Sequence, residues 1–185
     1  MIQSLLAGLR ITVASMAICV GGYTVVVWAF AQTVTPFTAN GSLLTDAAGN
    51  VVGSRLIAQG FTQPGYFWPR PSAVGYNAAG AAGSNKSPTS EDLRVRGEEI
   101  VALYSATPDN PLPADLAAAS GAGLDPHISE AAALYQVARV AGARGIEVPK
   151  VEALVQGAAY APGGPLTDGR IVNVLELNRA LDDLS

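Results

Sequence analysis

The sequence predicts an α+β protein: a single N-terminal transmembrane helix followed by one mixed extracytoplasmic domain with several helices and short strands. Three observations predict it: an uncharged apolar run at residues 11–31, helix-spaced apolar residues in the C-terminal half, and short apolar stretches between glycine- and proline-rich loops. The 185 residues divide into a cytoplasmic N-terminus at 1–10, the span at 11–31, a tether at 32–50 and the extracytoplasmic domain at 51–185. The roughly 150 residues beyond the span are the usual size of one domain.

The span reads ITVASMAICVGGYTVVVWAFA and contains no charged side chain. A helix of this length rises about 30 Å at 1.5 Å per residue, which matches the hydrocarbon core of a bilayer. Arg10 precedes the run and no charge follows it until Asp46, so the positive-inside rule predicts a cytoplasmic N-terminus. Trp28 and Phe30 near the outer end suit the headgroup level.

A cleaved secretory signal is the alternative, because Ala29-Phe30-Ala31 fits the small-x-small cleavage pattern. The apolar run is longer than the roughly 7–15 residues of a signal-peptide core, and one arginine makes a weak n-region. The length therefore favours an anchor. With cleavage, the mature chain would instead be a secreted ligand-binding protein.

Small side chains follow a helical rhythm through the span, interrupted only by Val26. They are Gly8, Thr12, Ser15, Cys19, Gly22 and Ala29. Helices in lipid associate by close backbone approach at such positions, which indicates contact with a helix of a partner or of a second copy. Chance is the alternative, because alanine and glycine are abundant throughout this chain. The span carries no charge and is not expected to line an ion path.

The charge balance excludes some classes of function. The formal net charge is −4, and beyond the span ten basic residues face fifteen acidic ones, a balance of −5. An acidic domain without a basic stripe is a poor nucleic-acid binder, so no nucleic-acid partner is expected. Cys19 is the one cysteine and lies in the span, so the domain has no internal disulfide and no thiolate metal site.

The first part of the chain beyond the span is predicted to be mostly irregular. Residues 33–50 read as a tether or loop with a turn at 46–50. Val51–Phe61 is compatible with a strand that Gly53 interrupts. Residues 64–88 combine prolines, glycines and four aromatic residues, which excludes a regular helix or a central strand. Long loops of this kind are often functional, and the aromatic residues favour an ordered one.

Capping residues and apolar spacing predict helices at Ser90–Ser105, Glu130–Arg144, Val148–Tyr160 and Val174–Leu184. Ser90, Ser129 and Asn173 stand at N-cap positions, Pro149 lies in a first turn, and Gly145 can end a helix in the left-handed conformation. The faces expected to be buried are Leu93, Ile100, Leu103 and Tyr104; Leu134, Val137, Ala138 and Ala141; Val151, Leu154 and Val155; and Leu177, Leu181 and Leu184. For 115–119 the sequence does not decide between a helical turn and a strand.

Asp125-Pro126-His127 places a carboxylate two residues from the only histidine, a pattern that can supply a general base. The sequence places no nucleophile within reach, so a structural Asp–His pair at a helix entry is favoured. One histidine without a cysteine in the domain cannot build a zinc site. Arg70 lies between two prolines and can donate to a carboxylate, either within the domain as an internal ion pair or on a partner.

Gly83-Ser84-Asn85-Lys86-Ser87 matches a phosphate-binding loop only weakly. Asn85 stands where such a loop needs a glycine directly before the lysine. A packed turn is therefore favoured over a nucleotide site.

Five motifs follow one another in a fixed order. They are Tyr66-Phe-Trp-Pro-Arg-Pro-Ser-Ala73 with Tyr76-Asn77; Gly83-Ser84-Asn85; Ala119-Ser-Gly-Ala-Gly-Leu-Asp-Pro-His-Ile-Ser129; Gln136-Val-Ala-Arg-Val140 with Ala143-Arg-Gly145; and Val172-Asn-Val-Leu-Glu-Leu-Asn178 with Ala180-Leu-Asp182. With the single N-terminal span, this series closely resembles the C subunits of bacterial Kdp potassium-transporting ATPases. The chain departs from the usual family pattern at Ala81-Ala82, Lys86 and Ala122, where Ser-Gly, Leu and Ser are usual.

The resemblance implies a non-catalytic subunit of a four-protein inner-membrane complex. Its partners would be a channel-like subunit that binds potassium, a P-type ATPase subunit that hydrolyses ATP and a small single-span subunit. The implied roles are assembly of the complex and, as a catalytic chaperone, a higher affinity of the pump for ATP. This chain would bind no cofactor itself; ATP and potassium act at the level of the complex. Because the domain is expected outside the membrane, any effect on ATP must arrive as a coupling free energy.

Two sets of residues are expected to meet partners: the small residues of the span, from Gly8 to Ala29, and motif residues of the domain. The motif residues are Arg70, Tyr76, Asn77, Ser84, Asn85, Asp125 and His127. The domain is expected to dock over the external mouth of the channel-like subunit. A membrane-anchored extracytoplasmic hydrolase that uses Asp125 and His127 is the rival hypothesis from another class.

Overall fold

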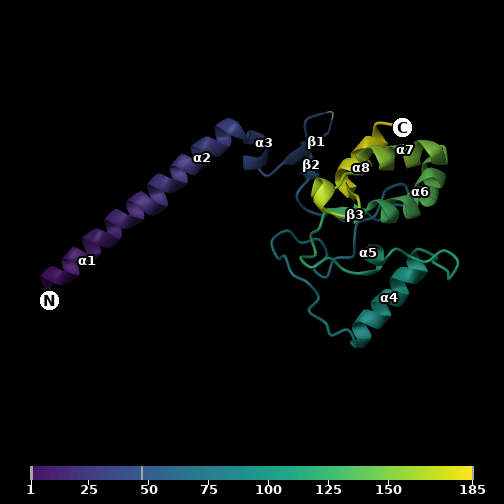
Figure 1. Ribbon diagram of the computed structural model, residues 1–185, viewed down its shortest axis with the longest axis horizontal. Coiled ribbons are helices and arrows are strands. Elements are labelled where there is room, and N and C mark those ends of the chain that lie inside the picture. Colours follow the sequence, from purple (N-terminus) through teal and green to yellow (C-terminus); the bar gives the residue numbers. More distant parts are fainter. Residues whose placement is uncertain (1, 47, 185) are drawn as a thin grey trace. The chain divides into compact units, whose positions relative to one another are not determined.

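The computed structural model describes residues 2–46 and 48–184 (Figure 1). The predicted α+β class is confirmed, because helices alternate with short strands that pair in two small sheets within these residues. In chain order the elements are α1 (Ile2–Ser15), the π-helix η1 (Met16–Gly22), α2 (Tyr23–Val34), α3 (Pro36–Ala39), β1 (Leu43–Thr45), β2 (Val51–Ser54), α4 (Glu91–Leu103), α5 (Ala114–Ala117), β3 (His127–Ser129), α6 (Glu130–Arg144), α7 (Val148–Ala158), the 3₁₀-helix η2 (Gly164–Leu166), β4 (Ile171–Asn173) and α8 (Val174–Asp182). The chain forms two compact units, one up to Val52 and one from Gly53 onward.

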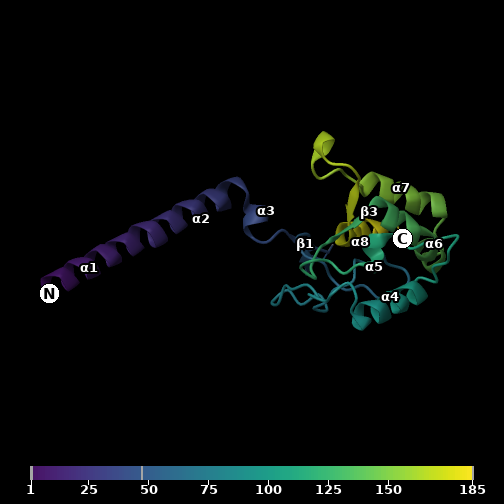
Figure 2. The same cartoon turned by 60° about the horizontal axis from the view of Figure 1, so that its bottom comes forward.

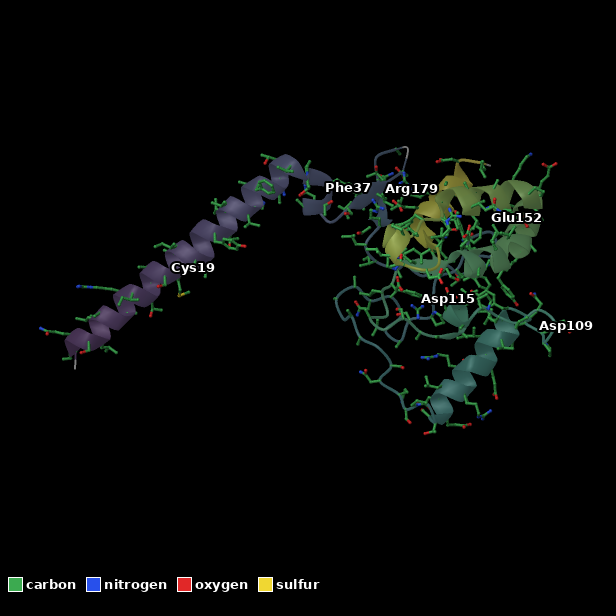
Figure 3. The ribbon with its side chains drawn as sticks, in the orientation of Figure 1. Cys19, Phe37, Asp109, Asp115, Glu152 and Arg179 are labelled. Carbon is green, nitrogen blue, oxygen red and sulfur yellow. The ribbon has the colours of Figure 1, made fainter. Side chains whose placement is uncertain are left out.

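One continuous helix from Ile2 to Val34, made by α1, η1 and α2, dominates the first unit (Figure 1). Its 33 residues are long and apolar enough to cross a membrane. At 1.5 Å per residue the helix is about 50 Å long, so the expected span at 11–31 lies inside a longer helix. None of the side chains of α1 and α2 is buried, and Cys19, near the middle of the helix, is exposed (Figure 3).

The segment expected to be a tether contains regular structure. Pro36 occupies the first turn of α3, where its missing N–H costs nothing, and the Asn40 side chain donates to the Pro36 carbonyl at 2.7 Å. Strand β1 follows and pairs with β2. The expected turn is present, because the Asp46 Oδ1 accepts from the Asn50 N–H at 2.8 Å. The strand expected over 51–61 is shorter, since the Ser54 hydroxyl accepts from the Leu56 N–H and turns the chain.

The core of the second unit lies among α6, α7, α8 and the ribbon of β3 and β4. The two strands are antiparallel, with His127 opposite Asn173, Ile128 opposite Val172 and Ser129 opposite Ile171. Apolar side chains from all these elements are buried together with Phe67 of the irregular segment and Leu116 of α5. These two three-residue strands are absent from the sequence-based prediction, because they are too short to show an alternating pattern.

Helix α6 begins and ends as predicted, with the Ser129 hydroxyl accepting from the Ala132 N–H and Gly145 at φ 67°. Its buried face differs from the prediction, since Leu134 and Ala138 are exposed. The face that packs is Ala132, Ala133, Gln136, Val137, Val140 and Ala141. Small residues dominate it because α6 lies directly against α7, and alanines allow that approach.

The other predicted helices are present, but their ends differ from the predicted ones. Helix α7 stops at Ala158, and α8 stops at Asp182, which leaves Leu184 49% exposed. Of the stripe expected for α4, only Ile100 is buried, whereas Leu93 and Tyr104 are half-buried and Leu103 is exposed. Ser90 has the N-cap conformation, but its side chain makes no capping hydrogen bond. For 115–119, where the sequence left a helical turn and a strand open, residues 115–117 lie in the short helix α5.

Candidate functional site

Two buried amides hold the aromatic segment against the helices. The Asn178 side chain on α8 accepts from the Phe67 N–H at 2.8 Å and donates to the Phe67 carbonyl at 3.0 Å. The Gln136 side chain on α6 does the same for the next residue, accepting from the Trp68 N–H at 2.8 Å and donating to its carbonyl at 3.1 Å. Each amide thus satisfies the N–H and the carbonyl of one backbone residue, as a neighbouring strand would in a sheet.

Two arginines continue this clamp on the outer side of the aromatic residues. The Arg139 guanidinium stacks 3.7 Å from the Trp68 ring centroid and donates to the Tyr66 carbonyl at 3.0 Å. Arg144 lies over the Tyr66 ring and binds Asp182 at 2.6 Å. Burial lowers the pKa of Arg139, yet a guanidinium stays protonated at neutral pH, so its stacking on Trp68 persists.

Arg70 of the first motif joins Asp125 and His127 of the third motif in one hydrogen-bonded chain. Arg70 Nη1 lies 3.1 Å from Asp125 Oδ2, which makes the internal ion pair. Asp125 Oδ1 accepts from the His127 N–H at 3.0 Å and lies 3.3 Å from its Nδ1. His127 Nε2 lies 3.0 Å from the Tyr160 hydroxyl. The hydrogen bond from His127, with Arg70 adding to it, holds the pKa of Asp125 below its ordinary value.

Ser129 and Asp115 lie beside this chain and are also paired. The Asp115 carboxylate accepts from the Ser129 N–H at 2.8 Å and from its hydroxyl at 3.1 Å. The same hydroxyl caps α6. Arg70, Asp115, Asp125 and His127 help line one surface pocket of about 420 Å³. The Ser129 hydroxyl donates to Asp115 rather than to His127, so the two do not form a nucleophile–base pair.

The loops of the first and third motifs pack tightly against each other. The Ser72 hydroxyl donates to the Gly123 carbonyl at 2.7 Å, and the Ser120 N–H donates to the Pro71 carbonyl at 3.0 Å. Gly123 has φ 69°, and a Cβ there would lie 2.6 Å from Val74. Glycine is therefore required at this position by both backbone conformation and space.

Tyr76 joins the cluster to an apolar pocket. Its hydroxyl donates to the Arg70 carbonyl at 3.0 Å, and burial raises its pKa. The pocket, about 280 Å³, is lined mainly by aromatic and aliphatic side chains that include Phe61, Trp68 and Tyr104. Burial also raises the pKa of Tyr104, whose ring meets Trp68 edge to face at 5.4 Å. This apolar pocket lies between the aromatic segment and the C-terminal part of α4.

The remaining predicted residues of the domain lie outside the hydrogen-bonded chain. Asn77 is exposed, and its side chain accepts from the Ala79 N–H at 3.0 Å. Asn85 is exposed at φ 50°, the left-handed conformation that asparagine tolerates. Ser84 lines a separate pocket together with Lys86 and Asp92, which are themselves paired at 2.5 Å. The packed turn expected at 83–87 is not seen, since the segment has no regular or turn structure and residues 85–87 are exposed.

The small residues of the span lie on the N-terminal helix, with a change of helix type in their midst. Cys19 and Gly22 belong to the π-helix η1, whereas Gly8 and Ala29 lie in the flanking α-helices. A π-helix bonds i to i+5 and turns less per residue than an α-helix. The small residues line up on one face only if the whole span is an α-helix. With η1 in the middle, those before it and those after it face different directions.

Sequence reasoning missed Gln136, Asn178 and Tyr160 as members of the site. A signal for the first two was available, because each is an amide on a helix face otherwise made of buried apolar residues, and such a group needs a buried partner. Tyr160 gave no such signal, since it reaches His127 only because its backbone bridges Ile171.

In this arrangement the charged side chains of Arg70, Asp125 and His127 lie within pairing distance of one another. Among the described residues, no group of three or more His, Cys, Asp or Glu side chains is placed to hold a metal ion. Both ring nitrogens of His127 face partners within the domain. What the site offers to its surroundings is a rigid surface built from the motif segments.

Comparison with known proteins finds relatives that match nearly the whole length of the chain. A family model described as KdpC, the c chain of the K+-transporting ATPase, matches residues 5–183. A potassium-transporting ATPase KdpC subunit of Parvibaculum lavamentivorans is 61% identical over 180 residues, which are 97% of this chain and 96% of that protein. KdpC subunits of Geobacter sulfurreducens and Myxococcus xanthus are 50% and 45% identical, covering 90% and 98% of this chain and 90% and 89% of their own lengths. The chain therefore belongs to the KdpC family, the c chain of the K+-transporting ATPase.

Proposed function

We propose that this chain is the non-catalytic subunit of a high-affinity, ATP-driven potassium uptake complex and that it stabilises the assembled complex. The observation that carries the proposal is that segments of the first and third motifs pack together through the paired side chains of Arg70, Asp125 and His127. At its Nε2, His127 meets the Tyr160 hydroxyl rather than a serine or cysteine nucleophile, so among the described residues the Asp125–His127 pair does not extend into a serine- or cysteine-hydrolase triad. The geometry thus favours a docking surface over the hydrolase that Asp125 and His127 suggested.

The proposed topology is single-pass in the inner membrane, with a cytoplasmic N-terminus and an extracytoplasmic domain. The single candidate span among the described residues and the position of Arg10 before its apolar part support it. The proposed partners are the channel-like potassium-binding subunit, the P-type ATPase subunit and the small single-span subunit. The domain would dock at the external mouth of the channel-like subunit.

Any effect of this chain on ATP follows from that topology. ATP and potassium act on the complex, and this chain binds neither in the proposal. An extracytoplasmic domain cannot touch a cytoplasmic nucleotide, so a chaperone role must act through the helices of its partners as a coupling free energy. Removing the chain should then lower the ATP affinity of the pump subunit without removing an ATP ligand.

A cysteine cross-link tests the docking surface. Asn77 is exposed within the motif region, so Asn77→Cys in a Cys19→Ser background should capture an extracytoplasmic loop of the channel-like subunit. Glu152→Cys on α7 is the control at an exposed site outside the motifs. Capture of cytoplasmic ATPase domains alone would reverse the topology. Substrate turnover by the full chain that His127→Ala abolishes would favour the hydrolase instead.

Gly22→Leu tests the small residues of the span. A Cβ at Gly22 meets only the Ala17 carbonyl at 3.8 Å, an ordinary contact, so the helix itself tolerates the change. If a partner helix packs there, the larger side chain should release the chain from the detergent-solubilised complex. Val20→Leu, which enlarges a residue of the span outside the set of small residues, is the control. Unchanged co-purification of the Gly22 variant would remove this contact from the proposal.

A further inference from the structure

The apolar pocket beside α4 has aromatic walls and an uncharged lining. Phe61, Trp68 and Tyr104 supply aromatic rings, and Pro69 and Pro71 add rigid apolar surface. None of the described residues that line the pocket is charged. Figure 2 shows α4 at the lower edge of its domain, on the opposite side from α7. The pocket therefore lies toward the edge of the domain rather than among the helices of its core.

The pocket has the size of a small aromatic molecule and is open to solvent. Its volume is about 280 Å³. A dry apolar cavity of about 150 Å³ binds benzene, so the larger volume has room for one aromatic ring with a short substituent. Thr62 and Leu103 line the pocket and are exposed, so a ligand can enter without a rearrangement of the fold.

The Tyr104 hydroxyl is a polar group of this pocket that is free to donate. The Tyr76 hydroxyl donates to the Arg70 carbonyl at 3.0 Å, and the Tyr135 hydroxyl donates to the Asn110 carbonyl at 3.3 Å. Among the described residues, none forms a hydrogen bond with the Tyr104 hydroxyl, although this side chain is half-buried. Burial raises the pKa of Tyr104, so its phenol stays protonated at neutral pH. A ligand with an acceptor oxygen would satisfy this donor.

The charges near the pocket favour an uncharged ligand. The Arg139 guanidinium lies 3.7 Å from the centroid of the Trp68 ring, which opposes the binding of a second cation to that ring. Arg139 lowers and Asp115 raises the pKa of Tyr104, so the nearby charges favour neither sign on a ligand. A charged ligand would also lose its hydration against an apolar lining that offers no ion-pair partner.

We propose that this pocket binds a small uncharged aromatic molecule with one acceptor oxygen, to which the Tyr104 hydroxyl donates. Apolar walls with a few well-placed polar groups are the usual features of small-molecule sites. The ring of the ligand would pack against Trp68 and Phe61 in offset or edge-to-face contacts. The site goes beyond the proposed function and does not depend on it, because every residue that forms it belongs to this chain.

Acetophenone, a neutral aromatic ketone of suitable size, is the probe. It is added to the full-length chain in detergent while the indole N–H resonances are followed by NMR. The chain has two tryptophans: Trp68 lines the pocket, and Trp28 is exposed on the N-terminal helix. We expect a saturable shift of the Trp68 resonance alone, because Trp28 reports partition of the probe into detergent. Benzoate and benzylammonium should bind more weakly by about 10-fold or more.

Two pairs of variants locate the ligand. Tyr104→Phe keeps the ring and removes the donor, so it should weaken acetophenone by about 2- to 10-fold and leave ethylbenzene, which has no acceptor, unchanged. Tyr135→Phe removes a hydroxyl outside the pocket and is its control. Leu103→Trp should fill the pocket and abolish the saturable shift of Trp68, whereas Val101→Trp, also exposed on α4, should not.

Thermal unfolding of Tyr104→Phe should match the wild type, because its hydroxyl has no partner in the described part of the chain. Equal shifts of both tryptophans, equal affinity of the wild type and Tyr104→Phe, or tighter binding of a charged analogue would overturn the site. Loss of acetophenone binding when the chain is in its purified complex would assign the pocket to a side chain of a partner, and would also overturn it.

Discussion

Replacing Asn178 by leucine tests whether the amide clamp holds the aromatic segment. The side chain is 2% exposed and satisfies both backbone groups of Phe67, which is itself fully buried. Asn178→Leu keeps the volume but leaves one buried N–H and one buried carbonyl without partners. Each unsatisfied group costs about 1–3 kcal/mol, so the free energy of unfolding should fall by roughly 2–6 kcal/mol. At about 2–4 °C per kcal/mol, Tm should fall by roughly 5–20 °C.

The assay is thermal unfolding of the full-length chain in detergent, monitored by the near-ultraviolet circular dichroism of the aromatic residues. Asn110→Leu is the same substitution at an exposed site and should change the free energy of unfolding by less than about 0.5 kcal/mol. Equal effects of the two substitutions would refute the clamp, because the cost would then not arise from the backbone groups of Phe67.

Four further changes have defined signs. Gly123→Ala should destabilise the chain by more than about 1 kcal/mol, because of the φ of 69° and because the new Cβ would lie 2.6 Å from Val74. Gly97→Ala within α4, where the new Cβ meets nothing, should stabilise the chain by about 0.5–1 kcal/mol. Chemical denaturation measures both changes. Ser129→Ala should cost about 1–2 kcal/mol through the lost cap of α6, measured in the same way. Asp125→Asn should destabilise the chain more at pH 7 than at pH 3 in urea titrations. The pKa of Asp125 is depressed by His127, so its stabilisation is present above the unfolded pKa near 3.8 and is lost as pH falls through the folded value.

Helices with strong local signals were predictable from the sequence. The N-cap at Ser129 and the left-handed Gly145 bound α6 at both predicted ends, and Asn173 caps α8 by accepting from the Glu176 N–H at 3.1 Å. These signals are local, because a cap is satisfied within the first turn of its own helix. The buried face of α6 was not predictable in the same way, since it depends on which neighbour the helix meets.

Contacts between distant segments were beyond sequence reasoning. The strand pair that sets His127 opposite Asn173 has three residues on each side, too few for a periodic pattern. The motif residues Arg70 and Asp125 were both named as candidates, but their pairing across 55 positions required the packing of two irregular loops. The π-helix at Met16–Gly22 also escaped prediction, because the apolar pattern of a span carries no record of helix type.

The central claim is that this chain acts as a bound subunit whose motif surface serves assembly. The most direct test is affinity purification of the tagged full-length chain from membranes of potassium-limited cells, followed by identification of the proteins that elute with it. We predict that the channel-like subunit and the P-type ATPase subunit elute in equal amounts with the chain. Elution of the chain alone, while an active complex forms without it, would contradict the account.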